Sequence, residues 1–154
     1  MKILLATDGS ECSKVAVDAV AGRPWPEGSE VKILSAIENP YMPTTETWVL
    51  PDDYFRELEG AARAQAEAAV NQAAERIEST DVCNASKLEI TTEIEYGPAK
   101  DAILDKAERW GADLIVIGSH GYSGWQRFLL GSVSHAVATH AHCSVEIIRR
   151  RKPA

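Results

Sequence analysis

Short apolar runs alternate with longer amphipathic segments along most of the chain. Residues 2–7 and 114–117 are compact apolar runs, a pattern typical of strands that are buried on both faces. Residues 31–37 and 145–149 predict two further strands. In residues 88–96 the apolar positions alternate with glutamates, which indicates a half-exposed strand at the edge of a sheet. The pattern therefore predicts five strands.

Between these strands, apolar residues recur at the spacing of a helix. The first predicted helix covers residues 10–22, with Ser10 as its N-terminal cap. A long helix is expected over residues 52–79, a third over residues 98–111 and a fourth over residues 132–139. Each helix separates two strands along the chain.

The long helix follows a proline-rich segment, residues 38–51, that we expect to form a surface loop. Its apolar residues lie at steps of three and four, so one face of the helix should pack against a sheet. The residues of this face are Phe55, Leu58, Ala62, Ala66, Ala69, Ala73 and Ile77.

Strands that alternate with helical crossovers pair in parallel through right-handed units. We therefore expect an α/β fold, with an open, doubly wound parallel sheet that carries helices on both faces. No internal repeat, low-complexity tract or linker divides the sequence, so residues 1–154 are predicted to form a single domain.

Composition and charge narrow the function classes. The chain of 154 residues has 16 Lys and Arg against 23 Asp and Glu, a net charge of -7. Binding to nucleic acid or to an anionic membrane surface favours basic proteins, so neither is expected. The apolar runs are too short to cross a bilayer, and the start of the chain lacks the apolar core of a signal peptide. Three cysteines without CxxC spacing indicate a reducing compartment, and we expect the protein to be cytoplasmic.

Candidate chemistry lies where the two most buried strands end. In an open α/β sheet, ligands bind beyond the carboxyl ends of the strands, at the point where the strand order reverses. Glycines cluster after one of these strands, over residues 118–124, and again at a predicted helix start, residues 131–134. Such glycines let the backbone approach an anion closely, and a helix N-terminus complements its charge. The P-loop and GxGxxG motifs are both absent.

The spacing that remains is Gly118-x2-Gly121-x9-Gly131-Ser132. Taken alone, it suits a series of tight turns as well as a phosphate site. With ILLATDGS at the start, EYGPAKDAILDKAERWGADLIVIGSHG in the middle and GSVSHAVATHAHCSVEII near the end, however, nearly the whole chain resembles the universal stress protein family. The complete glycine pattern resembles the subgroup of that family that binds ATP.

This resemblance implies a Rossmann-like sheet of five strands in the order 3-2-1-4-5, with ATP held at its centre and Mg²⁺ carried by the phosphates. By the same resemblance, Asp8 faces the adenine and ribose, and the base lies against Ala6, Thr7 and Ala36. The residues implied around the ribose and first phosphates are Gly118, His120 and Gly121. The residues implied to present amides and hydroxyls to the terminal phosphates are Gly131, Ser132, Val133 and Ser134.

Simpler interpretations stand beside these assignments. Asp8 also suits a plain turn, and Ser10 suits a cap better than a ligand. A metal site built from the histidines lacks ligand spacing, and His135, His140 and His142 are expected on the last turn of a helix instead. Ser132 has no GxSxG elbow and no acid to orient a base, so a hydrolase triad is not predicted. A further segment, Trp125 to Phe128 with Arg127, fits a lid, a surface for a partner or packing onto the domain itself.

The leading functional hypothesis is a regulatory stress-response protein that binds ATP and signals to an unknown protein partner. The alternatives are an enzyme, either a slow ATP hydrolase or an adenylyl-transfer relative, and a dimeric scaffold without a ligand. Phosphoryl transfer needs positioned charge, and Arg127 is the one candidate cation near the glycine loop, so we expect no enzyme activity beyond weak hydrolysis.

A homodimer is expected through the last strand, Val145–Ile148. In the order 3-2-1-4-5 this strand lies at an edge of the sheet. Its residues Val145, Ile147 and Ile148 are apolar, and we expect no proline or inward-facing charge to prevent pairing with a second copy.

Overall fold

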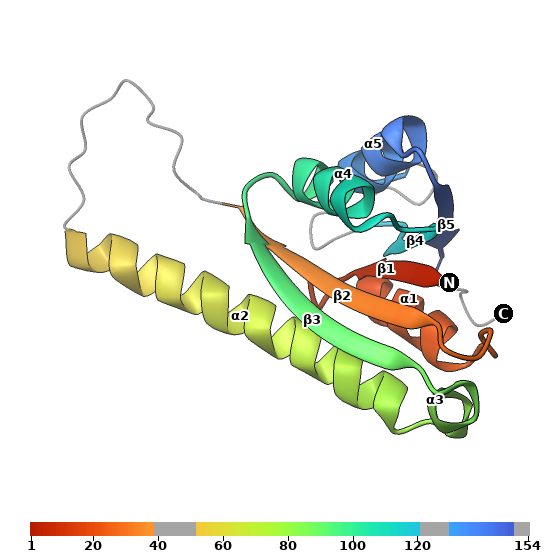
Figure 1. The fold of residues 1–154 in the computed structure, drawn as a ribbon. Helices are drawn as coiled ribbons and strands as arrows, with labels where there is room; N and C mark the ends of the chain where they lie inside the picture. The colour runs from red at the N-terminus through yellow and green to blue at the C-terminus, as the bar shows by residue number, and fades with distance from the viewer. Residues whose placement is uncertain (39–51, 121–129, 150–154) are drawn as a thin grey trace, which may run out of the picture.

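The computed structural model describes residues 1–38, 52–120 and 130–149. Its five strands lie parallel in one sheet, in the order β3-β2-β1-β4-β5 (Figure 1). The order and the parallel pairing of every neighbouring pair confirm the predicted fold class. The strands are β1 (Lys2–Ala6), β2 (Glu30–Ile37), β3 (Glu89–Tyr96), β4 (Leu114–Gly118) and β5 (Ser144–Ile148).

Helices cover both faces of the sheet, as Figure 1 shows. On one face lie α1 (Glu11–Ala21) and α2 (Asp52–Glu78), and on the other lie α4 (Ala99–Trp110) and α5 (Ser132–His140). Within the described ranges, no helix combines the length and the apolar character needed to cross a membrane.

The sheet separates two hydrophobic cores. Ile3 and Leu5 of β1 are fully buried in the core beneath α1 and α2, whereas Leu4 and Ala6 belong to the core beneath α4 and α5. Successive side chains of a strand point to opposite faces, so a strand in this central position needs apolar residues at every place. This is why β1 and β4 read as continuous apolar runs.

A short helix, α3 (Asp81–Ser86), lies between α2 and β3 and was not predicted. Thr80 caps its start by accepting a hydrogen bond from the amide of Cys83, and Lys87 ends it with a left-handed φ of 47°. Six residues make fewer than two turns, so no helical period of apolar residues can develop in the sequence.

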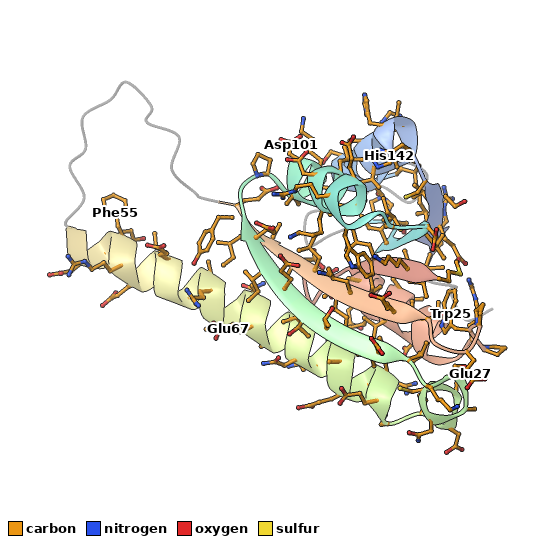
Figure 2. All side chains as sticks on the ribbon, in the orientation of Figure 1. Trp25, Glu27, Phe55, Glu67, Asp101 and His142 are labelled. Atoms are coloured by element: carbon orange, nitrogen blue, oxygen red, sulfur yellow. The ribbon has the colours of Figure 1, made fainter. Side chains whose placement is uncertain are left out.

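Only the second half of α2 packs as expected. Ala66, Ala69, Ala73 and Ile77 are buried against the sheet. The predicted face is exposed further toward the start of the helix, where Leu58 keeps 38% of its surface accessible. The first turns of α2 extend past the sheet, and Phe55 lies far out along this extension (Figures 1 and 2). The expectation of one continuous packed face was therefore wrong for the first half of the helix.

The edge strands β3 and β5 both carry charges that are paired. On β3, Glu93 and Glu95 form ion pairs with Lys106 of α4. On β5, both carboxylate oxygens of Glu146 accept hydrogen bonds of 2.6 Å from Arg23, which follows α1. The hydrogen bond from Arg23 holds the pKa of Glu146 below its usual range. The expectation that β5 has no inward-facing charge was therefore wrong, because Glu146 lies on the side of the strand that faces α1.

Candidate functional site

A cavity of about 350 Å³ opens at the carboxyl ends of β1, β2 and β4. Its other walls come from α4 and α5, so it lies on the face of the sheet that those helices cover. The cavity brings together ten of the eleven residues predicted from the sequence. They are Ala6, Thr7, Asp8, Ala36, Gly118, His120, Gly131, Ser132, Val133 and Ser134.

The remaining predicted residue, Gly121, lies outside the described residues, as do Trp125, Arg127 and Phe128. The glycine pattern therefore enters the described cavity through Gly118 and Gly131 alone.

Six residues of the cavity wall were missed by the sequence analysis. Leu34 lies two residues before Ala36 on β2, so its side chain points to the same face of the sheet. The period of two along a strand could therefore have identified Leu34. Nothing in the sequence points to the others, because they reach the cavity through helix packing or from a strand end. The six are Ser13, Leu34, Glu38, Ala99, Ile103 and Ile117.

On the side of β1, Asp8 both forms a turn and faces the cavity. Its Oδ1 accepts a hydrogen bond of 2.9 Å from the amide of Ser10. The hydroxyl of Ser10 in turn accepts one of 3.3 Å from the amide of Ser13, which confirms Ser10 as the cap of α1. Two amides at the N-terminus of α1, those of Ser10 and Ser13, are therefore already bonded to the protein's own side chains.

On the side of β4, the start of α5 is tied to the residue after the strand. The amide of Gly131 donates to the carbonyl of Ser119 at 2.9 Å, and the hydroxyl of Ser134 donates to the same carbonyl at 2.9 Å. These two groups had been expected to face phosphates, but they are already used to hold α5 in place.

The first-turn amides of α5 are the groups that remain for a ligand. In any helix these amides have no partner within the helix itself. Gly131 occupies the cap position and brings no capping side chain, and no side chain of the described ranges takes this role. Ser132, Val133 and Ser134 all line the cavity. The end of the cavity beside α5 therefore has the positive end of a helix dipole directed toward it.

Gly118 is required by the fold as well as by the cavity. A Cβ on this residue would lie 2.5 Å from the carbonyl oxygen of Cys12 in the first turn of α1. Real Cβ atoms do not approach backbone atoms so closely. The close contact of α1 with β4 therefore demands glycine here, whatever the ligand.

The histidines do not form a metal site in the described part of the chain, where no group of three or more His, Cys, Asp or Glu could hold an ion. Only His140 lies in the last turn of α5, where its Nδ1 is 2.9 Å from the carbonyl of Ala136. His135 lies near the start of this helix and His142 beyond its end (Figure 2), so the expected placement was wrong for these two.

A doubly wound α/β protein has its ligand site where the strand order reverses, and the cavity lies at that point of the sheet. The chain belongs to the universal stress protein family, whose model matches residues 1–149. Universal stress protein YxiE of Bacillus subtilis is 30% identical over 153 residues, which cover 96% of this chain and 98% of that protein. Universal stress protein A homolog 2 of Coxiella burnetii is 48% identical over 68 residues, which cover 42% of this chain and 46% of that protein.

Solved structures share the fold. The universal stress protein UspA from Lactobacillus plantarum is 28% identical, with a TM-score of 0.76 over 97% of each chain. A family member from Arabidopsis thaliana, solved with AMP bound, is 18% identical, with a TM-score of 0.67 over 98% of this chain and 92% of that one. A universal stress protein in complex with cAMP is 22% identical, with a TM-score of 0.59 over 97% of this chain and 96% of that one.

Proposed function

We propose that this protein is a cytoplasmic, single-domain stress-response regulator that binds an adenine nucleotide, ATP with Mg²⁺, in the cavity at the carboxyl edge of the sheet. The observation that carries this proposal is the division of the cavity into an apolar end and an end where, within the described ranges, no side chain caps the first-turn amides of α5. The bound nucleotide would then change how the protein contacts a partner protein.

The apolar end lies beside β2 and suits a flat base. Leu34, Ala36 and Ile103 contribute apolar walls there. The opposite end lies beside β4 and the start of α5, where free amides suit phosphates. Since β1 lies between β2 and β4, the two ends are separated by about two strand spacings, roughly 10 Å. One nucleotide can span this separation with its base at β2 and its phosphates at α5.

Two structural neighbours support an adenine nucleotide as the ligand class, because they were solved with AMP and with cAMP. The complete glycine pattern of this chain supports ATP among the adenine nucleotides. Mg²⁺ would be held by the phosphates, since such ions usually bind to proteins through substrate phosphates and few side chains. Denaturing the freshly purified protein and identifying the released small molecule by mass spectrometry tests the proposal. The absence of any adenine compound there, together with no heat on titration with AMP, cAMP or ATP, would refute it.

We expect hydrolysis of ATP to be absent or very slow. The described residues that line the cavity include the carboxylates of Asp8 and Glu38 but no lysine or arginine. Phosphoryl transfer depends on positioned positive charge, so little stabilisation of the transition state is available from these side chains. Steady-state release of phosphate should stay well below about one per second, the low end of the usual enzyme range. A faster rate, retained through a second purification step, would support the enzyme alternative instead.

We further propose that two copies associate through the open edge of β5. The carbonyl of Ile148 accepts a hydrogen bond of 2.9 Å from the amide of Ser119, so this residue's backbone groups face β4. Because neighbouring residues direct their backbone groups to opposite edges, the amide of Ile147 faces the open edge. Antiparallel pairing of this edge with its own copy would close a two-fold dimer.

The change Ile147→Pro should convert the dimer to a monomer, because proline removes the outward amide without removing a bond to β4. The matched control is Thr92→Pro on β3. The amides of Glu89 and Gly97 donate toward β2, and backbone groups alternate along a strand, so the amide of Thr92 should face the other open edge of the sheet. Light scattering should give twice the mass of one chain for the wild type and the control. A wild-type mass of one chain would refute the dimer, and a dimeric Ile147→Pro variant would place the interface elsewhere.

A further inference from the structure

Glu38 reaches from the end of β2 to the start of α4, at the mouth of the cavity. Its Oε1 accepts a hydrogen bond of 3.1 Å from the amide of Ala99, a residue 61 positions further along the chain. Glu38 and Ala99 both line the cavity. The residue before Ala99 is Pro98, which occupies the cap position of α4 without a capping side chain. The carboxylate of Glu38 therefore serves as the cap that α4 does not have in its own sequence.

Three helices that line the cavity begin at this edge of the sheet, and their N-termini differ in charge. That of α1 is capped by Ser10, with Asp8 beside it. That of α4 is covered by the carboxylate of Glu38, and that of α5 has no capping side chain in the described ranges. A negative group near α4 repels phosphate there, while the uncapped end of α5 attracts it. The cavity therefore has a carboxylate at the mouth of its apolar end, beside β2, and a positive helix terminus beside α5.

We infer that Glu38 is a specificity-determining residue, whose carboxylate accepts a hydrogen bond from the exocyclic amino group of the bound base. The inference rests on the proposed function, since it concerns the neutral end of the same nucleotide. Glu38 lies two residues after Ala36, at the apolar end of the cavity that suits the base. An ionised carboxylate has about four lone-pair sites that accept hydrogen bonds, and it donates none. It can therefore cap α4 and still accept a hydrogen bond from an amino group. It gives no favourable contact to a base that lacks a donor at this position.

The experiment compares AMP with purine riboside 5′-monophosphate, which has hydrogen in place of the amino group and the same phosphate. Calorimetric titration of the wild-type protein should show AMP bound about tenfold more tightly, the scale of a hydrogen bond to a charged group. In Glu38→Gln the amide oxygen can still cap α4, but the charged acceptor is gone. The affinity of this variant for AMP should therefore fall toward its affinity for the analogue. Its affinity for the analogue should differ from that of the wild type by less than about threefold.

The matched control is Asp101→Asn. Asp101 lies in the first turn of α4 (Figure 2), so its loss removes the same charge from the same helix terminus. It does not line the cavity, so the preference for AMP should remain. If the preference survives in Glu38→Gln, or is lost equally in Asp101→Asn, Glu38 does not read the base and the inference is overturned. If AMP, cAMP and ATP all fail to bind to the wild-type protein, the proposed function fails and this inference fails with it.

Discussion

Replacing Gly118 with alanine is expected to lower the free energy of unfolding by about 1–3 kcal/mol, the usual cost of overpacking a close contact. The added Cβ would lie 2.5 Å from the carbonyl oxygen of Cys12 and 2.7 Å from its carbonyl carbon. Both are backbone atoms, so no side-chain rotation can relieve the clash. Helix α1 would have to move away from β4. For a chain of this length the melting temperature should fall by about 2–4 °C for each kcal/mol.

Urea denaturation of the ligand-free protein measures this effect separately from any loss of binding. The matched control is Gly60→Ala in the outer turns of α2, where an added Cβ meets nothing within 4 Å. Alanine is favoured over glycine in a helix by about 0.5–1 kcal/mol, so the control should be at least as stable as the wild type. Equal stability of Gly118→Ala and the wild type would contradict the close packing of α1 on β4.

Replacing Ser132 with proline should weaken nucleotide binding by about 10- to 100-fold. Ser132 is the first residue of α5, where proline is well tolerated, and its amide is one of those that remain for phosphate. Loss of one hydrogen bond to a charged group removes about 1.5–3 kcal/mol. The preceding residue, Gly131, has φ of -59° and ψ of 154°, a conformation that a following proline permits. The fold should therefore persist while the binding weakens.

The control for this variant is Asp81→Pro, at the first position of α3. Thr80 before it has φ of -96° and ψ of 145°, so the backbone there also permits proline. Calorimetric titration with ATP and Mg²⁺ should give wild-type affinity for Asp81→Pro and a large loss for Ser132→Pro. Unchanged affinity of Ser132→Pro, in a variant with a wild-type melting curve, would exclude the start of α5 as the phosphate site.

The sheet could be predicted because burial on both faces leaves a direct mark on the sequence. β1 and β4 are apolar at consecutive positions, and β3 alternates because one of its faces meets charged partners such as Lys106. The short helix α3 left no such mark, since it is held by hydrogen bonds of two cap residues, Thr80 and Lys87. Local patterns therefore predict elements whose burial extends over several residues, and they miss elements held by one or two contacts.

The residues of the candidate site could be predicted only where they lie at strand ends or helix starts. The hydrogen bonds that these residues make within the protein could not be predicted. The amide of Gly131 is used by Ser119, and the carboxylate of Glu38 is used by Ala99. These contacts join segments that are 12 and 61 positions apart, so they exist only once the sheet has brought β2, β4 and the helices together. The fold thus decides which polar groups at the site remain free to bind a ligand.

A single helix, α2, contains two levels of local stability. From Ala66 onward it covers the sheet, and opening this part would expose Val70 and Ile77 to water. The turns before Ala66 bury little surface and are supported by exposed contacts, such as the ion pair of Arg63 with Glu67 at 2.9 Å and the interaction of Arg63 with Tyr96 of β3. Helical segments of this length are marginal in water when they lack tertiary packing. The outer turns can therefore open and exchange their amide hydrogens alone, whereas the inner turns exchange only when the core itself opens.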